Sequence, residues 1–429
     1  MSPFSRGLRA LAISLVGGLS LGVAWATLPN DLNDPTGSAP DVPTVSVTRL
    51  PWVAPAAPPD VPEELTVTVA FGGDMLLHQP VNASAAAAAG GAGGYEFSPL
   101  LAGADAWIAG ADLAICQMEV PLAPPGRSPS GYPVFGAPAE LVRDMAEQGW
   151  DGCTTSSNHS LDQGWDGLSH TIQTLRDAGL GYSGTALSAA DAELPQLYRL
   201  SGRGQTLTIA HVAATYGTNG LPAPAAQPWA VNTPIDTDLL IAQAEAARAA
   251  GADVVLATIH VGVEYQTTPT PEQREIVARL AASGQIDAVV GDHPHVAEPI
   301  ELVPGGVHGD GMWTIYSLGN FISNQTDAVV GPNTDTGAVA FLTITKDVAG
   351  AAVTGMTWAG VTVDTAHGHR VHMLQDSVAA DGELGQIGAA GVKVRYDRMR
   401  AIMGDSPEQL APPTPSGAAL EVLPRAAAG

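Results

Sequence analysis

Basic residues are scarce in this chain of 429 residues. It has 18 lysines and arginines against 43 aspartates and glutamates, which gives a formal net charge of −25. Nucleic acid and anionic membrane surfaces are poor partners for such a chain, because binding to them needs clustered basic side chains. The same charge repels a polyanionic substrate, unless a metal ion or a local arginine reverses the field.

Cysteine is also scarce, and several common motifs are absent. Cys116 and Cys153 are the only cysteines, and neither has the spacing of a zinc knuckle or a CxxC motif. Each closes a predicted strand, so the pair forms either a disulfide in an oxidising compartment or two buried thiols. The sequence has no P-loop, no GxGxxG after a strand and no GxSxG. The last of these absences argues against a serine nucleophile.

Long apolar runs are absent after the first residues of the chain. Arg6 and Arg9 precede a short apolar stretch over 11–23, and Ala24-Trp25-Ala26 then offers a cleavage site. We therefore expect residues 1–26 to be a cleaved export signal, or else an uncleaved anchor, and the protein to be extracellular or attached to the cell envelope. A proline-rich linker over 27–64, a folded domain over 65–375 and a low-order tail over 376–429 are predicted to follow.

Short apolar runs alternate with helical patterns through the predicted domain. TVTVAF, DLAI, DGCTT, DVVLATI and DAVV have the character of buried parallel strands. Helices are predicted near 99–109, 138–148, 164–178, 239–250 and 271–283, and an alanine- and glycine-rich loop over 83–94. This βαβα order predicts an α/β layered domain with β-rich elements at its end.

A polar island follows each of these apolar runs. Ligands at the carboxyl ends of parallel strands converge on one edge of a sheet, where open α/β folds keep their sites. Two metal ions held close together activate water and stabilise a leaving oxygen, and they need carboxylate, amide and imidazole ligands. His159 is placed to protonate a leaving group. The candidate ligands for two divalent ions (Mn, Fe or Zn) are Asp74, Glu119, Asn158, His260, His293 and His295.

Three further residues are candidates for contact with substrate. Glu264 and Tyr265 follow the strand that ends at His260, and we expect them to orient that imidazole or to contact substrate, the alternative being an exposed loop pair. Asn320, in the motif SLGNF, either lines the site or forms a turn.

Two other features are assigned structural roles. Asp162 is expected to cap the helix that follows it. His367, His369 and His372 form a later group of histidines, for which we favour ordinary packing over a surface nickel or zinc site.

The order of the motifs resembles the bacterial capsule synthesis protein family, CapA, which is linked with poly-γ-glutamate production. The motifs are GD, ME, SNHSLDQG, HVGVEY, GDHPHV and SLGNF, and they span residues 66–345. The resemblance implies a four-layer α/β/β/α sandwich similar to calcineurin-like metallophosphatases. It also implies a dinuclear site with the six ligands above and with His159 as the acid.

The function implied by this resemblance is an exported hydrolase or transferase that uses a metal-bound hydroxide. Its substrate would be an extracellular polymer or a precursor of one, and its partners other capsule synthesis proteins. Two alternatives stay open: an accessory subunit of a capsule synthesis or export complex with a relic metal site, and a carbohydrate- or cell-wall-binding module.

The chain departs from the family pattern at several positions. It has Gln117-Met118-Glu119 where the family usually has Asn-Leu-Glu, and Asp292 where the family often has histidine. Metallophosphatases proper have a histidine two residues after the first aspartate. Leu76 stands there in this chain, and whether the later His78 replaces that histidine is open.

Overall fold

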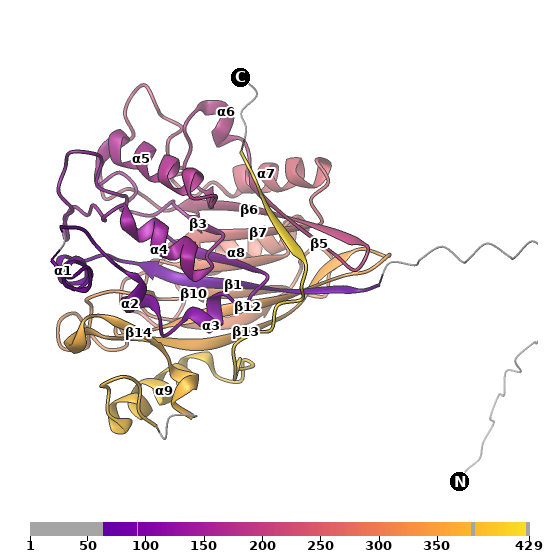
Figure 1. Cartoon of the computed structure of the whole chain (residues 1–429). Coiled ribbons are helices and arrows are strands. Elements are labelled where there is room, and N and C mark those ends of the chain that lie inside the picture. The colour runs from indigo at the N-terminus through magenta and orange to yellow at the C-terminus, as the bar shows by residue number, and fades with distance from the viewer. Residues whose placement is uncertain (1–62, 92, 379–381, 426–429) are drawn as a thin grey trace, which may run out of the picture. The chain divides into compact units, whose positions relative to one another are not determined.

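Two β-sheets lie face to face in the folded part of the chain (Figure 1). The computed structural model describes residues 63–91, 93–378 and 382–425, so the predicted export segment over 1–26 and nearly all of the 27–64 linker lie outside the described residues. Within the described ranges, no helix combines the length and apolar character needed to cross a bilayer.

The first sheet is mixed and has eight strands. Its central strand, β1, pairs parallel with β2 and antiparallel with β12, and the short β11 (Asn320–Ile322) also pairs parallel with it. The order across the sheet is β14 (Arg370–Met373), β13 (Ala351–Asp364), β12 (Thr336–Lys346), β1 (Leu65–Met75), β2 (Leu113–Gln117), β3 (Gly152–Thr154) and β4 (Gly181–Ser183).

The second sheet has seven strands and a parallel centre. β7 pairs parallel with both β6 and β8, and β8 pairs parallel with β10. The order across the sheet is β15 (Ala419–Leu423), β5 (Gln196–Gly202), β6 (Gln205–Thr215), β7 (Val254–His260), β8 (Ala288–Asp292), β10 (Met312–Ser317) and β9 (Glu298–Val303).

Helices cover the outer faces of both sheets, which confirms the predicted four-layer α/β/β/α sandwich. One apolar core joins α2–α5 to the first sheet, a second fills the space between the sheets, and a third joins α7 and α8 to the second sheet. The helices are α1 (Gln79–Ala88), α2 (Ser98–Leu101), α3 (Asp105–Ile108), α4 (Glu140–Gln148), α5 (Gly164–Asp177), α6 (Ala189–Ala192), α7 (Thr237–Ala249), α8 (Pro271–Ser283) and α9 (Ala389–Met403).

Local sequence signals explain where the helix after β7 begins and ends. The Thr270 side chain accepts a hydrogen bond from the backbone of Gln273, whose side chain in turn accepts one from the backbone of Thr270. Pro271 occupies the first turn, where a missing N–H is harmless, and Gly284 ends the helix in a left-handed conformation. The predicted helix over 271–283 is therefore present with the same bounds.

Two predictions about the first sheet's helices were wrong in detail. The alanine-rich segment expected to be a loop over 83–94 contributes most of α1, because alanine has the highest helix propensity and Pro80 starts the first turn. The helix expected over 99–109 is two short helices, α2 and α3, separated at Gly103. A side chain at Gly103 would meet the backbone of Val371, so the chain there lies directly against β14.

The predicted low-order tail over 376–429 is also corrected, because much of it is folded onto the body. α9 buries Val392, Met399 and Met403 in the core between the sheets. β15 then pairs antiparallel with β5 at the edge of the second sheet. Its sequence ALEVL has too short a pattern to predict a strand, and the exposed edge of β5 supplies the missing pairing.

Arg425 fixes the end of this added strand. Its guanidinium donates to the carbonyl oxygens of Tyr182 and Thr185, each at 3.1 Å, and lies 4.5 Å from the centre of the Tyr182 ring. The ion pair with Asp191 completes its surroundings. The described C-terminal segment is therefore part of the sandwich.

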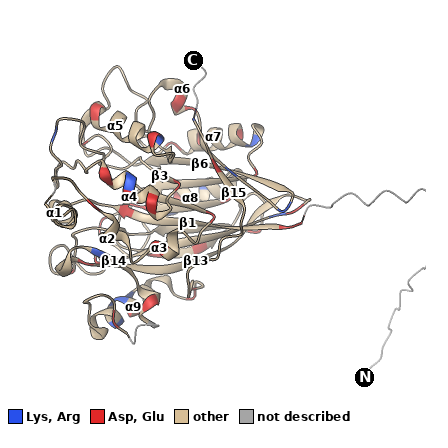
Figure 2. Ribbon diagram, in the orientation of Figure 1, with Lys and Arg blue, Asp and Glu red and all other residues tan. Residues whose placement is uncertain are grey.

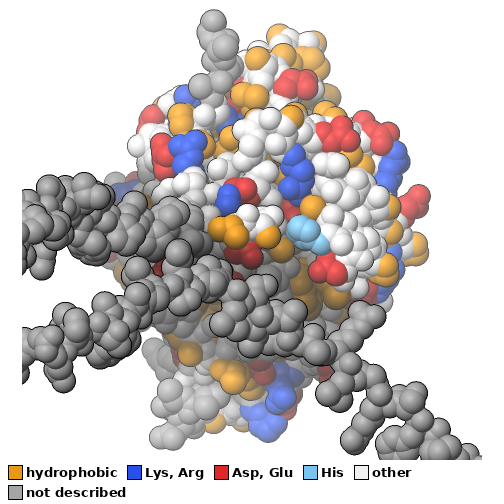
Figure 3. Space-filling model, turned by 90° about the vertical axis from the view of Figure 1, so that its right-hand side faces the viewer, with side chains coloured by type: hydrophobic (Ala, Val, Ile, Leu, Met, Phe, Trp, Pro, Cys, Tyr) orange, Lys and Arg blue, Asp and Glu red, His pale blue; other side chains and the backbone are white. Residues whose placement is uncertain are grey.

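Charged residues lie mainly on helices and loops rather than within the sheets (Figure 2). Where the face in Figure 3 is not covered in grey, acidic, basic and apolar side chains are mixed, and the basic ones do not form a continuous surface.

Candidate metal centre

Asp74 reaches the space between the sheets through an irregularity in β1. Val69 and Phe71 face the core between the sheets, so strict alternation would turn Asp74 the other way. The pairing with β2 shifts register between Gly72 and Asp74, and Met75 packs in the outer core instead. A bulge of this kind re-aims the side chains that follow it, and here it turns Asp74 inward.

Glycine precedes aspartate at both ends of the site because no side chain fits there. A Cβ on Gly73 would lie 1.9 Å from the carbonyl oxygen of Gly319. A Cβ on Gly291 would lie 1.9 Å from the carbonyl oxygen of Tyr316. Each Gly-Asp pair therefore lets its strand pass a neighbouring backbone closely just before the carboxylate.

Asp74, Glu119 and His295 form a buried group with the geometry of metal ligands. One donor atom from each lies within 4.8 Å of the others, and among the described residues this is the one such group of three. His295 Nδ1 lies 3.0 Å from Asp74 Oδ2, and its Nε2 lies 3.6 Å from Glu119 Oε1. His295 therefore lies between the two carboxylates, and an ion shared by the three residues would take one of its ring nitrogens.

Asn158, His260 and His293 form a second group beside the first. His260 Nε2 lies 2.9 Å from Asn158 Oδ1, and the rings of His260 and His293 are 5.0 Å apart. Gln117 Nε2 lies 3.2 Å from His260 Nδ1, so it orients that imidazole from behind. The six predicted ligands therefore meet at one edge of the sandwich.

The turn around Pro294 presents both of its histidines to the site. His293 has a φ of 100° and His295 a φ of 60°, values that non-glycine residues seldom adopt. Their rings are 6.1 Å apart with 53° between the planes. Strained backbone of this kind is concentrated at functional sites, and here it places two imidazoles against different partners.

His159 is paired with a carboxylate at the mouth of the site. Its Nδ1 lies 2.8 Å from Asp162 Oδ2, which also accepts the backbone N–H of Phe135 at 2.7 Å. The Phe135 ring meets the His159 ring edge-on at 4.8 Å, and the Asn219 amide lies 3.4 Å from Nδ1. This corrects the expectation that Asp162 caps the next helix: its carboxylate is used to hold His159.

Burial and mutual charge perturb the ionisable groups of the centre. Burial raises the pKa of Glu119 well above its usual value, and the charge of Asp74 adds to this. Burial, followed by the charges of Asp74 and Glu119, raises the pKa of Asp292 in the same way. Burial lowers the pKa of His295, but the charges of Glu119 and Asp74 outweigh this effect and raise the pKa to about 9. Burial lowers the pKa of His293 to about 3.

The donor set fits divalent cations. Within the described residues, His295 pairs with the carboxylates of Asp74 and Glu119, but no lysine or arginine does. Burying several charges with so little compensation is costly. Several buried donors here also lack a hydrogen-bond partner, a state that bound ions would relieve. These atoms are Asp74 Oδ1, Glu119 Oε1 and Oε2, Asp292 Oδ1 and His293 Nδ1.

The predicted substrate contacts differ in position. Tyr265 stacks over His295 at 6.1 Å, and Glu264 beside it is exposed, so both lie at the mouth. Asn320 is buried, and its amide donates to the backbone oxygens of His295 and Thr334. Asn320 therefore supports the turn that carries His295, while its Oδ1 has no hydrogen-bond partner among the described residues. Its contact with substrate stays a prediction.

His78 does not replace the histidine missing at Leu76. Its Nδ1 lies 3.2 Å from the Leu76 carbonyl oxygen, and its ring meets Phe135 edge-on at 5.2 Å. Leu76 itself is buried in the outer core. The first aspartate therefore has no histidine partner from its own strand.

Sequence reasoning missed Gln117, Asp292 and Asn219 as members of the site. Strand alternation was the available signal for the first two, since Gln117 and Asp292 end β2 and β8 on the same face as the apolar residues that point between the sheets. Asn219 comes from the loop after β6 and carries no such signal. Only the folded loop brings it against His159.

The fold and the centre define a class of protein: a two-sheet α/β sandwich with a carboxylate–imidazole site at one edge. The sequence profile described as "Bacterial capsule synthesis protein PGA_cap" matches residues 68–325. The chain therefore belongs to this family of bacterial capsule synthesis proteins.

Individual relatives match over a smaller part of their length. A "Capsule biosynthesis protein CapA" of Bacillus anthracis is 30% identical over 197 residues, which are 44% of this chain and 44% of the relative. A "PGA biosynthesis protein CapA" of Bacillus subtilis (strain 168) is 30% identical over 187 residues, 43% of this chain and 46% of the relative. The chain thus matches less than half the length of each relative.

A solved structure gives a weaker likeness. The match is to the calcineurin-like phosphoesterase YfkN of Bacillus subtilis. It covers 78% of this chain and 100% of the phosphoesterase chain, at 13% identity and with a TM-score of 0.38.

Proposed function

We propose that this protein is an exported metal-dependent hydrolase that acts in the metabolism of a capsule polymer. The observation that carries the proposal is the meeting of Asp74, Glu119 and His295 in one buried group. Its carboxylates keep unpartnered oxygen atoms, and among the described residues the imidazole of His295 pairs with them but no lysine or arginine does. Two divalent ions at this edge would activate water and stabilise a leaving oxygen.

Each predicted ligand has a position that suits this role. Asp74, Glu119 and His295 would hold one ion, and Asn158, His260 and His293 would hold the other. Gln117 holds His260 and Asn320 holds the turn of His295, so the ligand set is supported from behind.

His159 has the surroundings of a proton donor. Asp162 accepts the hydrogen of Nδ1 at 2.8 Å, which fixes the ring and leaves Nε2 as the atom that exchanges a proton. The packing of Phe135 against the ring excludes water from one side. A leaving group at the mouth of the site would receive its proton from this atom.

The Cys116–Cys153 disulfide supports the exported location. Its sulfur atoms join β2 to β3 directly before Gln117 and Thr154, in the strands that lead to the site. Disulfides persist in oxidising compartments outside the cytosol. The bond therefore agrees with the export segment predicted from residues 1–26.

Metal analysis combined with a substrate panel tests the proposal. The purified protein would be loaded with Mn, Fe or Zn, dialysed, and assayed with phosphomonoesters, phosphodiesters and γ-glutamyl amides. We expect bound metal and metal-dependent turnover of one substrate class. His159→Ala should retain the metal and lower turnover by about 10²- to 10⁴-fold, the usual range for a proton donor.

His170→Ala serves as the matched control, since His170 lies on α5 outside the site. It should leave turnover unchanged. Absence of bound metal under every loading condition would contradict the proposal, and so would full turnover by the His159→Ala protein.

An accessory role in a polymer synthesis or export complex is the second candidate. The observation that favours it is Leu76, an apolar residue buried where a metal ligand is expected. A variant with His293→Ala and His295→Ala that still supports polymer export in cells would select the accessory role.

A further inference from the structure

Asp292 points toward the metal centre, although the ligand set above does not include it. In β8, Ala288 and Val290 face the core between the sheets, and Val289 faces the outer helices. Alternation therefore turns Asp292 toward the space between the sheets. It also lies beside His260 in parallel register with β7, so the two side chains leave the sheet on the same face.

The carboxylate of Asp292 is buried without a partner. Its exposure is 1%, and Oδ1 has no hydrogen-bond partner among the described residues. The charged groups that act on it most strongly are Asp74 and Glu119, which lie across the gap between the sheets. Asp292 thus faces a buried space that already holds two carboxylates, and among the described residues the imidazole of His295 pairs with both of these but no lysine or arginine does.

Asp287, directly before β8, shows what a structural aspartate looks like in this fold. Its carboxylate accepts from Arg248 and from the backbone N–H of Val255, both at 2.6 Å. It is buried like Asp292, but its charge is neutralised and its oxygen is used. The contrast between these two nearby aspartates indicates that Asp292 is kept for a partner outside the chain.

We propose that Asp292 is a ligand of the metal centre, contributing a third carboxylate oxygen in addition to those of Asp74 and Glu119. This inference rests on the proposed metal-dependent function. A hard divalent cation is the partner that a buried oxygen donor without hydrogen bonds fits best. With three carboxylates present, one divalent ion leaves the centre negative, so the third carboxylate favours occupancy by two ions.

Cobalt binding to an Asp292→Asn variant of the full-length protein tests the proposal. Asparagine keeps the size of the side chain and removes its charge. Co²⁺ would be titrated into the metal-free protein and followed by its visible absorption, which reports the ligand set directly. We expect affinity for at least one ion to fall about 10-fold or more, and the absorption bands to change.

Asp287→Asn, directly before the same strand, is the matched control. It should lower stability, because Arg248 loses its partner, and leave Co²⁺ binding and the absorption bands unchanged. If the unaltered protein binds no Co²⁺ or Mn²⁺, the proposed function itself fails. If the unaltered protein binds Co²⁺ and Asp292→Asn has the same affinity, stoichiometry and spectrum, only the role of Asp292 is overturned.

A crystal structure of the Mn²⁺-loaded, unaltered protein gives a second measurement that does not depend on a variant folding. We expect an Asp292 carboxylate oxygen within about 2.2 Å of an ion, the usual length of such a bond. A separation too long for coordination would overturn the proposal.

Discussion

The molecule has two groups of histidines, and their surroundings differ. His260, His293 and His295 come from the ends of β7 and β8 and meet buried carboxylate and amide oxygens. His367 and His369 lie close together in sequence, yet each imidazole has its own partner. The exposed His367 pairs with Asp364 at 2.9 Å, and the buried His369 contacts Ser84 and Asn324, each at 2.8 Å.

This difference shows that convergence in space, rather than closeness in sequence, makes a metal centre. In the later group, His367 and His369 direct their hydrogen bonds to separate protein atoms and so join segments. The buried Nε2 of His372 lacks a partner among the described residues, but these histidines do not form a cluster of close donor atoms there. In the site, His293 Nδ1 and several carboxylate oxygens lack partners within the described part of the chain. Unsatisfied donors that converge are what a cation requires.

Removal of imidazoles from each group gives the largest expected contrast. His293→Ala with His295→Ala should weaken metal binding by more than about 100-fold, since loss of even an outer partner weakens affinity by about 10- to 100-fold. His367→Ala with His369→Ala should leave the bound metal unchanged. Metal content after dialysis measures both, and equal loss in the two variants would break the comparison.

The sequence was sufficient to predict the layers and to single out six candidate ligands that the fold brings to one edge, because strand ends with polar residues are a local pattern. That these six residues bind metal stays a prediction. The sequence could not identify the orienting role of Gln117, since the partner, His260, is 143 residues away along the chain. It also could not identify β15, whose pairing depends on the free edge of β5. For Asn320 the sequence left two roles open, because burial beneath the His295 turn is a tertiary property.

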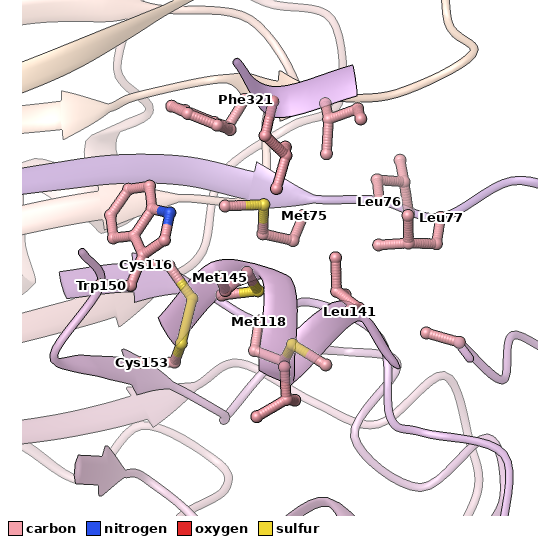
Figure 4. Packing of buried hydrophobic residues seen from close by; sticks show 14 of the residues in the cluster. Met75, Leu76, Leu77, Cys116, Met118, Leu141, Met145, Trp150, Cys153 and Phe321 are labelled. Carbon is pink, nitrogen blue, oxygen red and sulfur yellow. A yellow bond between two sulfur atoms is a disulfide. The ribbon is translucent and has the colours of Figure 1, made fainter. Parts of the chain in front are cut away.

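A disulfide joins two of the strands that lead to the metal centre. The Cys116–Cys153 bond joins β2 to β3 below the site and packs among Met75, Met118 and Trp150 (Figure 4). The two cysteines have a sequence separation of 37, for which chain entropy predicts a loss of about 4 kcal/mol of unfolding free energy when the bond is removed.

Denaturant unfolding of a Cys116→Ala, Cys153→Ala protein measures this loss, and reduction of the unaltered protein is the control for the cavity that alanine leaves. The later histidine group should be unaffected by the change. Equal unfolding free energies for the oxidised and reduced proteins would show that the bond does not stabilise the site strands.

Glu298 lies three residues after His295, and a variant at this position distinguishes the effect of a buried carboxyl group from the effect of a metal ligand. Burial raises its pKa to about 7, although the amide of Gln273 donates to it at 2.6 Å. The pKa of this group in the unfolded chain is near 4.5. Between pH 4.5 and about 7 the folded state therefore binds one more proton than the unfolded state, and the unfolding free energy falls as pH rises through this range. The contribution is at most about 3 kcal/mol.

Unfolding measured from pH 4.5 to 8 in the metal-free protein should show a smaller decline for Glu298→Gln than for the unaltered chain. Metal content should be the same in both proteins, because Glu298 is not among the proposed ligands of either metal ion. An identical pH dependence in the two proteins would contradict the raised pKa.

The smallest expected effect concerns the later histidine group itself. Ser84, on α1, lies 2.8 Å from His369 Nδ1, and Asn324 Oδ1 accepts the hydrogen of the opposite ring nitrogen. Ser84→Ala removes one hydrogen bond to a buried imidazole, which should lower the unfolding free energy by about 1 kcal/mol and leave metal content unchanged. Ser169→Ala, on α5, controls for loss of a surface hydroxyl. A loss of metal in the Ser84→Ala protein would mean that the later group binds an ion, and the distinction between the two groups would no longer hold.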